Sequence, residues 1–348
     1  MKKFTKIVAT LGPASDSYTI IKRMVQAGMN VVRLNFSHGT HAEHAHLLQN
    51  VRNVSKDLNI PIAVMQDLQG PKIRVEELKT PYTVKRGDLI TLTTSSQIKN
   101  AIPVQYKKLP MEVKPGASIF INDGMVELTV LRTNKKDRIE CKVIAGGEIA
   151  SRKGINVVGA TLSAGVLSPK DKDDLKWGIA HHVDYVALSF VKSAKDIIAV
   201  KKYLKETGIK IIAKIERTEA VRPGVLDEII KVSDAVMVAR GDLGVEVGPE
   251  HVPILQKRII HISNTYGKPV ITATQMLTSM LENPVPTRAE VSDIANAILD
   301  HTDALMLSNE TSVGAFPIKT IQVMSKIALT VEKEMAKYTL FNAYKKED

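Results

Sequence analysis

A (β/α)₈ barrel, the TIM-barrel type of α/β protein, with an inserted all-β domain after its third strand is the fold that the sequence predicts. Eight short apolar, β-branched runs alternate with helical segments, and one long strand-rich stretch interrupts the alternation. The eight predicted strands are residues 7–11, 30–35, 62–67, 185–190, 211–216, 235–240, 270–274 and 304–308.

Amphipathic segments between these runs predict the helices of the barrel. Ser168-Pro169 supplies a helix N-cap followed by proline at the first helical position. The predicted helices include residues 17–26, 42–55, 170–180, 194–206, 288–299 and 318–332.

The stretch between the third strand and residue 170 is far longer than an ordinary βα loop. It is rich in Val, Ile and Thr over 82–94, 118–134 and 138–149, with turn signals Arg-Gly-Asp, Asn-Asp-Gly and Asn-Lys-Lys. We therefore predict that residues 76–155 form an inserted β-barrel-like domain. Residues 1–75 and 156–348 then form the barrel, close to the roughly 250 residues typical of this fold.

Composition and charge narrow the class of protein. A content of 44% hydrophobic and 24% charged residues is typical of a globular protein, and neither a signal peptide nor a membrane span is present, so we expect a cytoplasmic protein. Cys141 is the only cysteine, which excludes an internal disulfide and a cysteine-based metal site. The net charge of +11 admits nucleic acid or a small phosphorylated anion as a partner, but the basic residues are scattered and aromatic residues are only 4%, so a solvated surface is the favoured explanation and small anionic ligands come next.

Polar residues end five of the eight predicted strands, at the rim where barrel enzymes place their active sites. A single strand-end charge ordinarily faces water, but so many at one rim predict a site. They are Arg33 and Asn35 at the end of strand two, Asp67 at the end of strand three, Lys214 and Glu216 at the end of strand five, Gly241 and Asp242 just after strand six, and Thr274 at the end of strand seven.

The chemistry of this set favours phosphoryl transfer. Glu216 and Asp242 are carboxylates suited to a hard cation such as Mg²⁺. Arg33, Lys72, Arg74 and Lys214 supply positive charge for phosphate oxygens, and positioning and charge stabilisation are what phosphoryl transfer requires. His41, His44 and His46 fall at the start of a predicted helix, where we expect surface histidines rather than a metal site. Glu290 and Asp293 are expected to act in a helix start or a subunit contact.

Seven strings resemble those of pyruvate kinases, in family order over residues 5 to about 318. The resemblance implies transfer of the phosphoryl group of phosphoenolpyruvate to ADP in glycolysis, giving pyruvate and ATP, with Mg²⁺ or alternatively Mn²⁺. The strings are TKIVATLGPAS (5–15), MNVVRLNFSHG (29–39), GPKIR (70–74), IAKIER (212–217), ARGDLGVE (239–246), ATQML (273–277) and PTRAEVSD (286–293).

The resemblance also implies residue roles. Lys214, Arg33 and Thr274 would be catalytic, Glu216 and Asp242 would bind Mg²⁺, and Gly241 and Asp242 would join the catalytic residues in binding phosphoenolpyruvate. The nucleotide would be bound by His38, Arg74, Lys153 and Asp123, with Asp123 on an inserted domain that acts as a lid.

Two departures from familiar members of that family are visible. A K⁺ site would comprise Asn35, Ser37, Asp67 and the Leu68 backbone, but Lys72 stands where K⁺-dependent members have glutamate, so we expect its ammonium to replace K⁺. The given sequence also stops before the usual C-terminal regulatory domain, either because this is a short natural form or because that domain has been lost; if the chain is complete, we expect no sugar-phosphate effector site and simple kinetics.

Three alternatives stay open at this point. One is another Mg²⁺-dependent barrel enzyme acting on phosphoenolpyruvate or pyruvate, the second a catalytically silent relative, and the third a nucleic-acid-binding relative. The expected partners are phosphoenolpyruvate and ADP rather than nucleic acid or membrane, and a homo-oligomer formed through the barrel is compatible with the resemblance.

Overall fold

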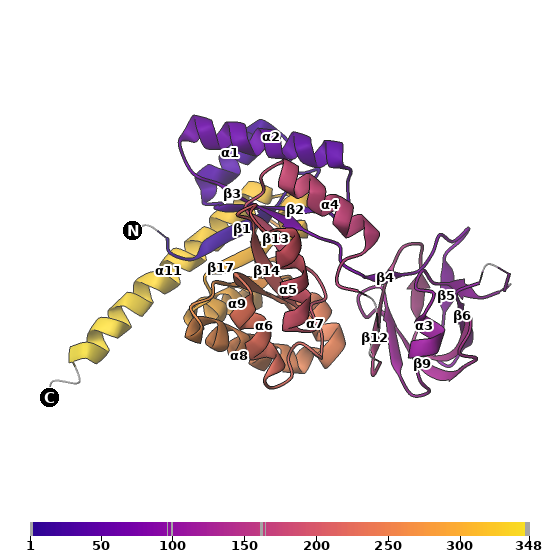
Figure 1. Ribbon diagram of the computed structural model, residues 1–348. Coiled ribbons are helices and arrows are strands. Elements are labelled where there is room, and N and C mark those ends of the chain that lie inside the picture. Colours follow the sequence, from indigo (N-terminus) through magenta and orange to yellow (C-terminus); the bar gives the residue numbers. More distant parts are fainter. Residues whose placement is uncertain (1–2, 96, 99, 161–162, 164, 345–348) are drawn as a thin grey trace. The chain divides into compact units, whose positions relative to one another are not determined.

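The structure is a computed structural model that describes residues 3–95, 97–98, 100–160, 163 and 165–344, and side chains up to residue 337. The chain divides into two compact units (Figure 1). The barrel unit comprises Met1–Gly70, Leu167–Arg240 and Glu250–Asp348, and the second unit comprises Pro71–Val166 and Gly241–Pro249.

The barrel unit confirms the predicted fold class. Its eight strands form a closed barrel in the order β1-β17-β16-β15-β14-β13-β3-β2, and every neighbouring pair is parallel. The strands are β1 (Lys6–Thr10), β2 (Val31–Asn35), β3 (Ala63–Asp67), β13 (Tyr185–Leu188), β14 (Lys210–Ile215), β15 (Ala235–Ala239), β16 (Val270–Ala273) and β17 (Ala304–Leu307).

Helices follow the strands, and several begin with strong local signals. Thr40 with Glu43, Ser168 with Asp171 and Thr287 with Glu290 form capping boxes, in which each side chain bonds the other residue's backbone N–H. The helices are α1 (Tyr18–Ala27), α2 (His41–Leu58), α4 (Pro169–Ala180), α5 (Ala194–Tyr203), α6 (Val225–Val232), α7 (Arg240–Val247), α8 (Val252–Thr265), α9 (Arg288–Leu299), α10 (Asn309–Ser312) and α11 (Pro317–Tyr344).

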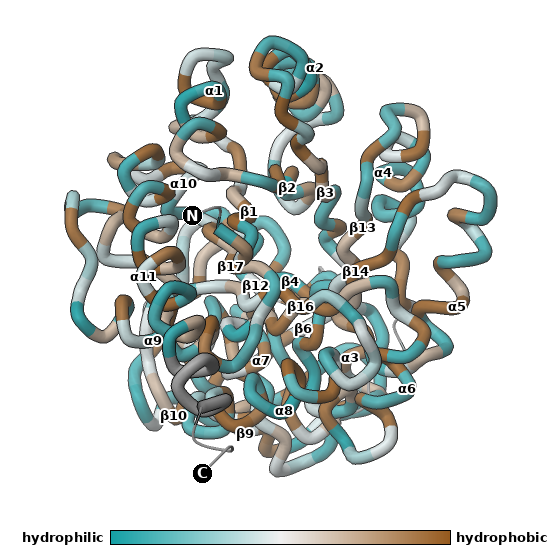
Figure 2. Tube along the Cα trace, turned by 90° about the vertical axis from the view of Figure 1, so that its left-hand side faces the viewer, coloured by the Kyte–Doolittle hydropathy of each residue, from teal (hydrophilic) through white to brown (hydrophobic). Residues whose placement is uncertain are grey.

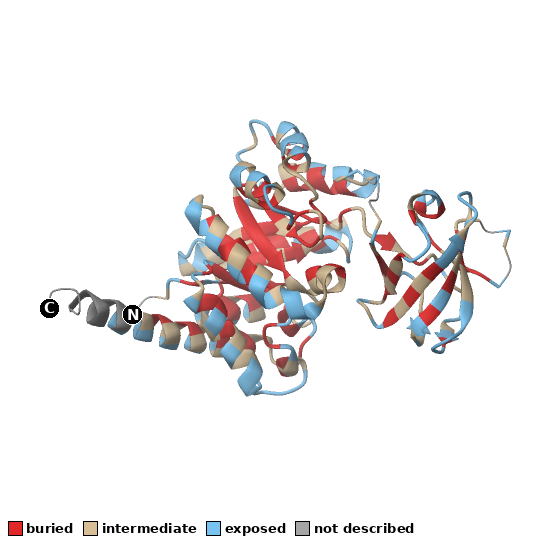
Figure 3. Ribbon diagram, turned by 90° about the horizontal axis from the view of Figure 1, so that it is seen from below, coloured by how far each residue is buried: buried red, intermediate tan, exposed pale blue. Residues whose placement is uncertain are grey.

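Burial explains why the strands read as continuous apolar runs. Side chains such as Met65, Met237 and Met306 fill the barrel interior, and the strands are almost entirely buried (Figure 3). Apolar and polar residues alternate along outer helices such as α2 and α4 (Figure 2), as expected for helices that cover a sheet on one side. Over residues 3–344, apart from the gaps given above, no helix is long and apolar enough to cross a membrane.

The second unit is built of the strands that the sequence predicts between residues 82 and 149, with short additions on either side. A seven-stranded sheet has the order β4-β12-β8-β9-β10-β6-β7, and β11 pairs with β5. The elements are β4 (Ile73–Arg74), β5 (Tyr82–Val84), β6 (Leu89–Thr93), β7 (Ile102–Pro103), α3 (Leu109–Glu112), β8 (Ser118–Ile121), β9 (Val126–Thr133), β10 (Arg138–Ala145), β11 (Gly147–Ile149) and β12 (Gly154–Val158).

Backbone contacts connect the two edges of this sheet. Val75 forms an antiparallel bridge with Val104, and the amides of Glu76 and Gln105 donate to the carbonyls of Pro103 and Arg74 at 2.9 and 3.0 Å. The predicted Asn-Asp-Gly turn lies between β8 and β9, where Asn122, Asp123 and Gly124 all have positive φ (57°, 54° and 90°). Such backbone is tolerated best by glycine and short polar residues.

Cys141 offers a test of how tightly the hydrophobic core of the second unit is packed. Its side chain is fully buried on β10, and burial first, then the nearby Glu140 carboxylate, raises the pKa of the thiol to about 12. Because the thiolate is the reactive form, we expect negligible labelling by a disulfide reagent at pH 8 and rapid labelling in denaturant. Stoichiometric labelling of the native protein within minutes would contradict the described packing.

Candidate active site

A buried cluster of charges lies at the C-terminal ends of strands in the barrel unit. The Lys214 ammonium, on β14, lies 3.1 Å from Asp67 Oδ1 and 3.0 Å from Glu216 Oε1, and it donates to Ser189 Oγ at 2.7 Å. Arg33 Nε lies 2.6 Å from the other oxygen of Asp67. The strand ends predicted from the sequence therefore bring together Arg33, Asp67, Lys214 and Glu216, and we call these four residues the barrel cluster.

Water is nearly excluded from this cluster. The carboxylates of Asp67 and Glu216 are 1% exposed, whereas Lys214 and Arg33 are 11% and 12% exposed. Burial alone would raise the pKa of Asp67, but the Lys214 and Arg33 charges and their hydrogen bonds outweigh it and hold that pKa below its ordinary value. The cluster thus pairs two buried anions with two cations whose side chains are slightly more exposed.

Neighbouring backbone fixes the orientation of the cluster. Glu216 Oε2 accepts a hydrogen bond from the Phe190 amide at 2.7 Å, and Arg33 Nη1 donates to Thr10 Oγ1 at 2.9 Å. Ser189 Oγ in turn donates to the Leu68 carbonyl at 2.8 Å. Thr10 and Ser189 were not predicted as site residues, although Thr10 ends β1 and Ser189 directly follows β13.

Thr274, which follows β16, has an unusual backbone conformation. Its φ is +72° and that of Gln275 is +53°, and a β-branched residue rarely adopts the left-handed region. Such a conformation costs on the order of 1–3 kcal/mol and persists only where surrounding contacts enforce it. The side chain of Arg240 provides contacts of this kind, because it donates to the carbonyls of Thr274 at 2.8 Å and Ala273 at 3.2 Å.

A second group of charges lies within the second unit. Lys72 Nζ is 3.0 Å from Asp242 Oδ1 and 3.7 Å from Asp123 Oδ1, and the Lys72 side chain is only 17% exposed. Arg74 lies near both carboxylates. Burial lowers the pKa of its guanidinium, and the charges of Asp123 and Asp242 partly offset that effect. We call Lys72, Arg74, Asp123 and Asp242 the second-unit cluster.

The other two residues predicted to bind the nucleotide, Lys153 and His38, belong to different units. Lys153 is exposed and precedes β12, beside Arg74, since Gly154 pairs with Arg74 across the two strands. His38 belongs to the barrel unit, in the loop between β2 and α2, and its carbonyl accepts a hydrogen bond from His44 Nε2 at 3.0 Å.

Residues expected around a monovalent cation lie mostly in the barrel unit. Asn35 and Asp67 are paired neighbours on β2 and β3, and the Asn35 side chain accepts from the Ser37 amide at 3.2 Å. Leu68 offers its carbonyl, which already accepts from Ser189. Lys72 belongs to the second unit, where it pairs with carboxylates as described above.

Comparison with known proteins identifies the family. The family described as "Pyruvate kinase, barrel domain" matches residues 2–321. The chain belongs to the pyruvate kinase family. It is 47% identical over 338 residues to pyruvate kinase 2 of Synechocystis, 46% over 334 residues to the pyruvate kinase of Thermococcus litoralis, and 45% over 336 residues to that of Thermotoga maritima.

These alignments cover unequal shares of the proteins compared. They include 94–95% of this chain, but 57% of the Synechocystis pyruvate kinase and 70% and 72% of the Thermococcus and Thermotoga enzymes. The chain therefore spans between somewhat over half and about three quarters of the length of these pyruvate kinases, and the match includes both charge clusters.

Two expectations about histidines are corrected by the structure. His44 is buried rather than on the surface, and its ring stacks on Phe36 with centroids 4.1 Å apart. Burial lowers its pKa. His41 does have a carboxylate partner, because Asp174 of α4 lies 2.8 Å from its Nε2. The loop between β2 and α2 supplies Phe36 and α4 supplies Asp174, whereas His46 is exposed as expected.

Glu290 and Asp293 were both expected to act in a helix start or a subunit contact, and the structure shows the helix-start role for Glu290. Glu290 caps α9 together with Thr287, and it also accepts bonds from the amide and hydroxyl of Ser279. Asp293 instead pairs with Arg240 at 2.7 Å. Its side chain thus contributes to the surroundings of Thr274.

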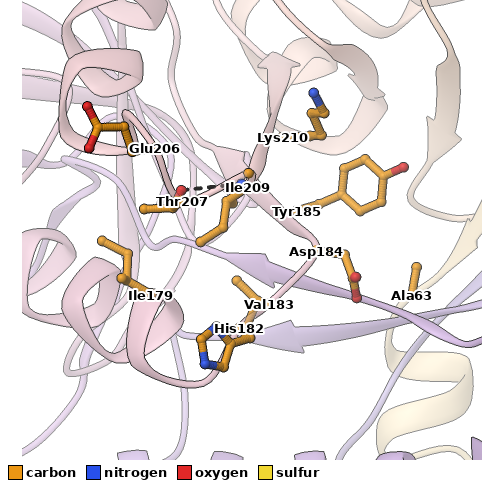
Figure 4. Close-up of a pocket in the computed structure, with 11 residues that line it drawn as sticks. Ala63, Ile179, His182, Val183, Asp184, Tyr185, Glu206, Thr207, Ile209 and Lys210 are labelled. Carbon is orange, nitrogen blue, oxygen red and sulfur yellow. Dashed lines mark hydrogen bonds between the residues drawn. The ribbon is translucent and has the colours of Figure 1, made fainter.

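A cavity of about 700 Å³ lies at the other end of the barrel strands (Figure 4). It is lined by residues at the beginnings of strands, including Ala63, Tyr185 and Lys210, together with His182 and Glu206. None of the predicted site residues lines it, so it is separate from the barrel cluster.

Proposed function

We propose that the chain transfers the phosphoryl group of phosphoenolpyruvate to ADP, giving pyruvate and ATP. The observation that carries this proposal is the barrel cluster, in which two cations at the C-terminal rim are held by two buried carboxylates. Phosphoryl transfer depends chiefly on positioned positive charge, and this cluster holds such charge without needing to reorganise. Membership of the pyruvate kinase family supports the same reaction.

Each member of the site has a role in the proposal. Arg33 binds the phosphoryl group, and Lys214 stabilises both that group and the negative charge that develops on the enolate oxygen. The Gly241 and Asp242 amides and the Thr274 hydroxyl bind the carboxylate of phosphoenolpyruvate. His38, Arg74, Lys153 and Asp123 are proposed to contact ADP.

The donor set fits Mg²⁺, with Mn²⁺ as the alternative metal. Glu216 and Asp242 offer hard oxygen ligands, and among the described side chains no group of three or more His, Cys, Asp or Glu forms a complete metal cage. Mg²⁺ is typically bound by one or two carboxylates together with water and substrate oxygens. When bound, the metal would neutralise charge on the phosphoryl oxygens.

We further propose that activity is independent of K⁺ because Lys72 replaces the monovalent charge. Its support is that Lys72 is mostly buried and paired with Asp242 and Asp123, rather than extended into solvent. A fixed ammonium in that position compensates nearby carboxylates as a bound monovalent cation would.

The test is pyruvate formation from phosphoenolpyruvate and ADP with Mg²⁺, titrating K⁺ upward from a potassium-free buffer at constant ionic strength. Full activity without K⁺ would support both proposals. Activity only with K⁺ would keep the reaction and remove the role of Lys72. No pyruvate at any K⁺ concentration, from a folded protein, would contradict the proposed function of this chain.

A further inference from the structure

We propose that Arg240 is a positioning residue that holds Thr274 in its left-handed backbone conformation and thereby orients the Thr274 side chain. The inference rests on the proposed function, since it concerns how one residue of that site is placed. It assigns Arg240 a role through Thr274 and not through contact with substrate.

The starting observation is the strained backbone after β16. Thr274 and Gln275 both have positive φ, at +72° and +53°, although neither is glycine. A glycine at position 274 would adopt this conformation without penalty, so the presence of a β-branched hydroxyl residue needs another reason. Strain of this kind is found where the side chain is used and where the surrounding structure enforces the conformation.

The contacts of Arg240 can hold the backbone of Thr274 in this conformation. Two of its nitrogens donate to the backbone carbonyls on either side of the Thr274 N–Cα bond, about which φ is measured. Nε donates to the carbonyl of Ala273 at 3.2 Å and Nη2 to that of Thr274 at 2.8 Å. Nη2 also contacts the Met276 sulfur at 2.8 Å. The guanidinium therefore spans three positions of the segment that follows β16.

The guanidinium is itself anchored from two other helices. Nη1 is 2.7 Å from Asp293 Oδ1 on α9 and 3.2 Å from Gln256 Oε1 on α8. Arg240 is 11% exposed and Gln256 5% exposed, so the bond between them meets little competition from water, whereas Asp293 is 36% exposed. Because Nη1 bonds these two side chains, Nε and Nη2 are directed toward the carbonyls of Ala273 and Thr274, and their hydrogen bonds hold the backbone at Thr274.

Only a planar fork can make this set of bonds. A lysine at position 240 would preserve the positive charge, but a single ammonium cannot reach the carbonyls, Asp293 and Gln256 in the same directions. Arg240→Lys therefore removes these hydrogen bonds but keeps the positive charge. The variant can thus separate an effect of the hydrogen bonds from an effect of the charge.

The experiment is a double-mutant cycle on pyruvate formation with the whole chain, using Arg240→Lys, Thr274→Ala and the double variant. If Arg240 acts through Thr274, we expect Arg240→Lys to reduce kcat at least ~10-fold in the parent and less than ~2-fold in the Thr274→Ala background. Independent effects that multiply in the double variant would overturn the proposal, including the case in which Arg240 acts through α7, of which it is the first residue.

Arg258→Lys is the matched control. Arg258, on α8, also donates to a backbone carbonyl, but to that of Val221, at 3.3 Å, rather than to one in the segment after β16. This variant should keep the parental kcat. Unfolding by heat is followed for every variant, so that a loss of folded protein is not counted as a loss of kcat.

Hydrogen exchange separates this inference from the proposed function. Arg240→Lys should accelerate amide exchange in a peptide covering residues 272–277, whereas Arg258→Lys should leave that peptide unchanged. If the parent protein forms no pyruvate, the proposed function fails and the exchange result alone decides whether Arg240 holds this segment. Unchanged exchange in Arg240→Lys would overturn the inference whether or not the protein is active.

Discussion

Replacing Lys214 with methionine is expected to reduce pyruvate formation by at least ~10³-fold and to destabilise the fold by roughly 3–5 kcal/mol. The ammonium lies within 3.1 Å of two carboxylates that are each 1% exposed. Its removal takes a cationic partner from both Glu216 and Asp67, and Arg33 still pairs with Asp67. Initial rates and equilibrium unfolding at pH 7 measure the two effects.

The stability of this variant should depend on pH in a direction opposite to that of the parent. In the parent, the lowered pKa of Asp67 contributes stability that is present above the unfolded-state pKa and is lost as pH falls through the lower folded-state value. Without Lys214, burial acts on Asp67 with less opposition and raises its pKa. The difference in the free energy of unfolding between parent and variant should therefore shrink as pH falls through the raised pKa of Asp67 in the variant.

Lys201→Met provides the matched control for this prediction. Lys201 also pairs with a carboxylate, Asp234 at 3.0 Å, but the two side chains are 40% and 25% exposed. Such a pair contributes about 1 kcal/mol or less, so this variant should keep its activity and nearly all of its stability. Equal losses in both variants, or a Lys214→Met protein with parental rates, would be incompatible with the proposed role of the barrel cluster.

The sequence predicted the barrel and its polar rim for one physical reason. Parallel strands buried on both faces produce short continuous apolar runs, and their C-terminal ends must meet at one edge of the barrel. Arg33, Asp67, Lys214 and Glu216 follow from this rule although Arg33 and Glu216 are far apart in the chain. The neutral residues Thr10 and Ser189 did not stand out because hydroxyl side chains are ordinary at strand ends.

Contacts between distant elements could not be predicted in the same way. Asp174, which pairs with His41, lies 133 residues further along the chain, and the Lys72–Asp242 pair spans 170 residues. No periodicity in the sequence encodes such distances. The strain at Thr274 was equally hidden, because a threonine at the end of an apolar strand gives no sign of a positive φ.

Replacing Lys72 with glutamate is expected to make activity depend on K⁺. In a potassium-free buffer the new carboxylate would lie beside Asp242 and Asp123, which are 3.0 and 3.7 Å from the present ammonium. Three neighbouring carboxylates repel each other and attract a cation, so we expect activity to fall at least ~100-fold without K⁺ and to recover as K⁺ is added. The parent should respond little over the same titration, with tetramethylammonium chloride keeping the ionic strength constant.

Charge reversal elsewhere in the second unit separates this effect from a general change in net charge. Lys107 lies 3.4 Å from Glu76, and the two side chains are 68% and 38% exposed, so Lys107→Glu changes the net charge equally but at the surface. We expect that variant to stay independent of K⁺.

Full activity of Lys72→Glu without K⁺ would show that the ammonium is not needed. A loss that K⁺ cannot reverse, in a folded protein, would show that Lys72 does something other than replace a monovalent charge. Only recovery by K⁺ identifies the ammonium and the ion as equivalents, because only then does the same charge serve the reaction from either source.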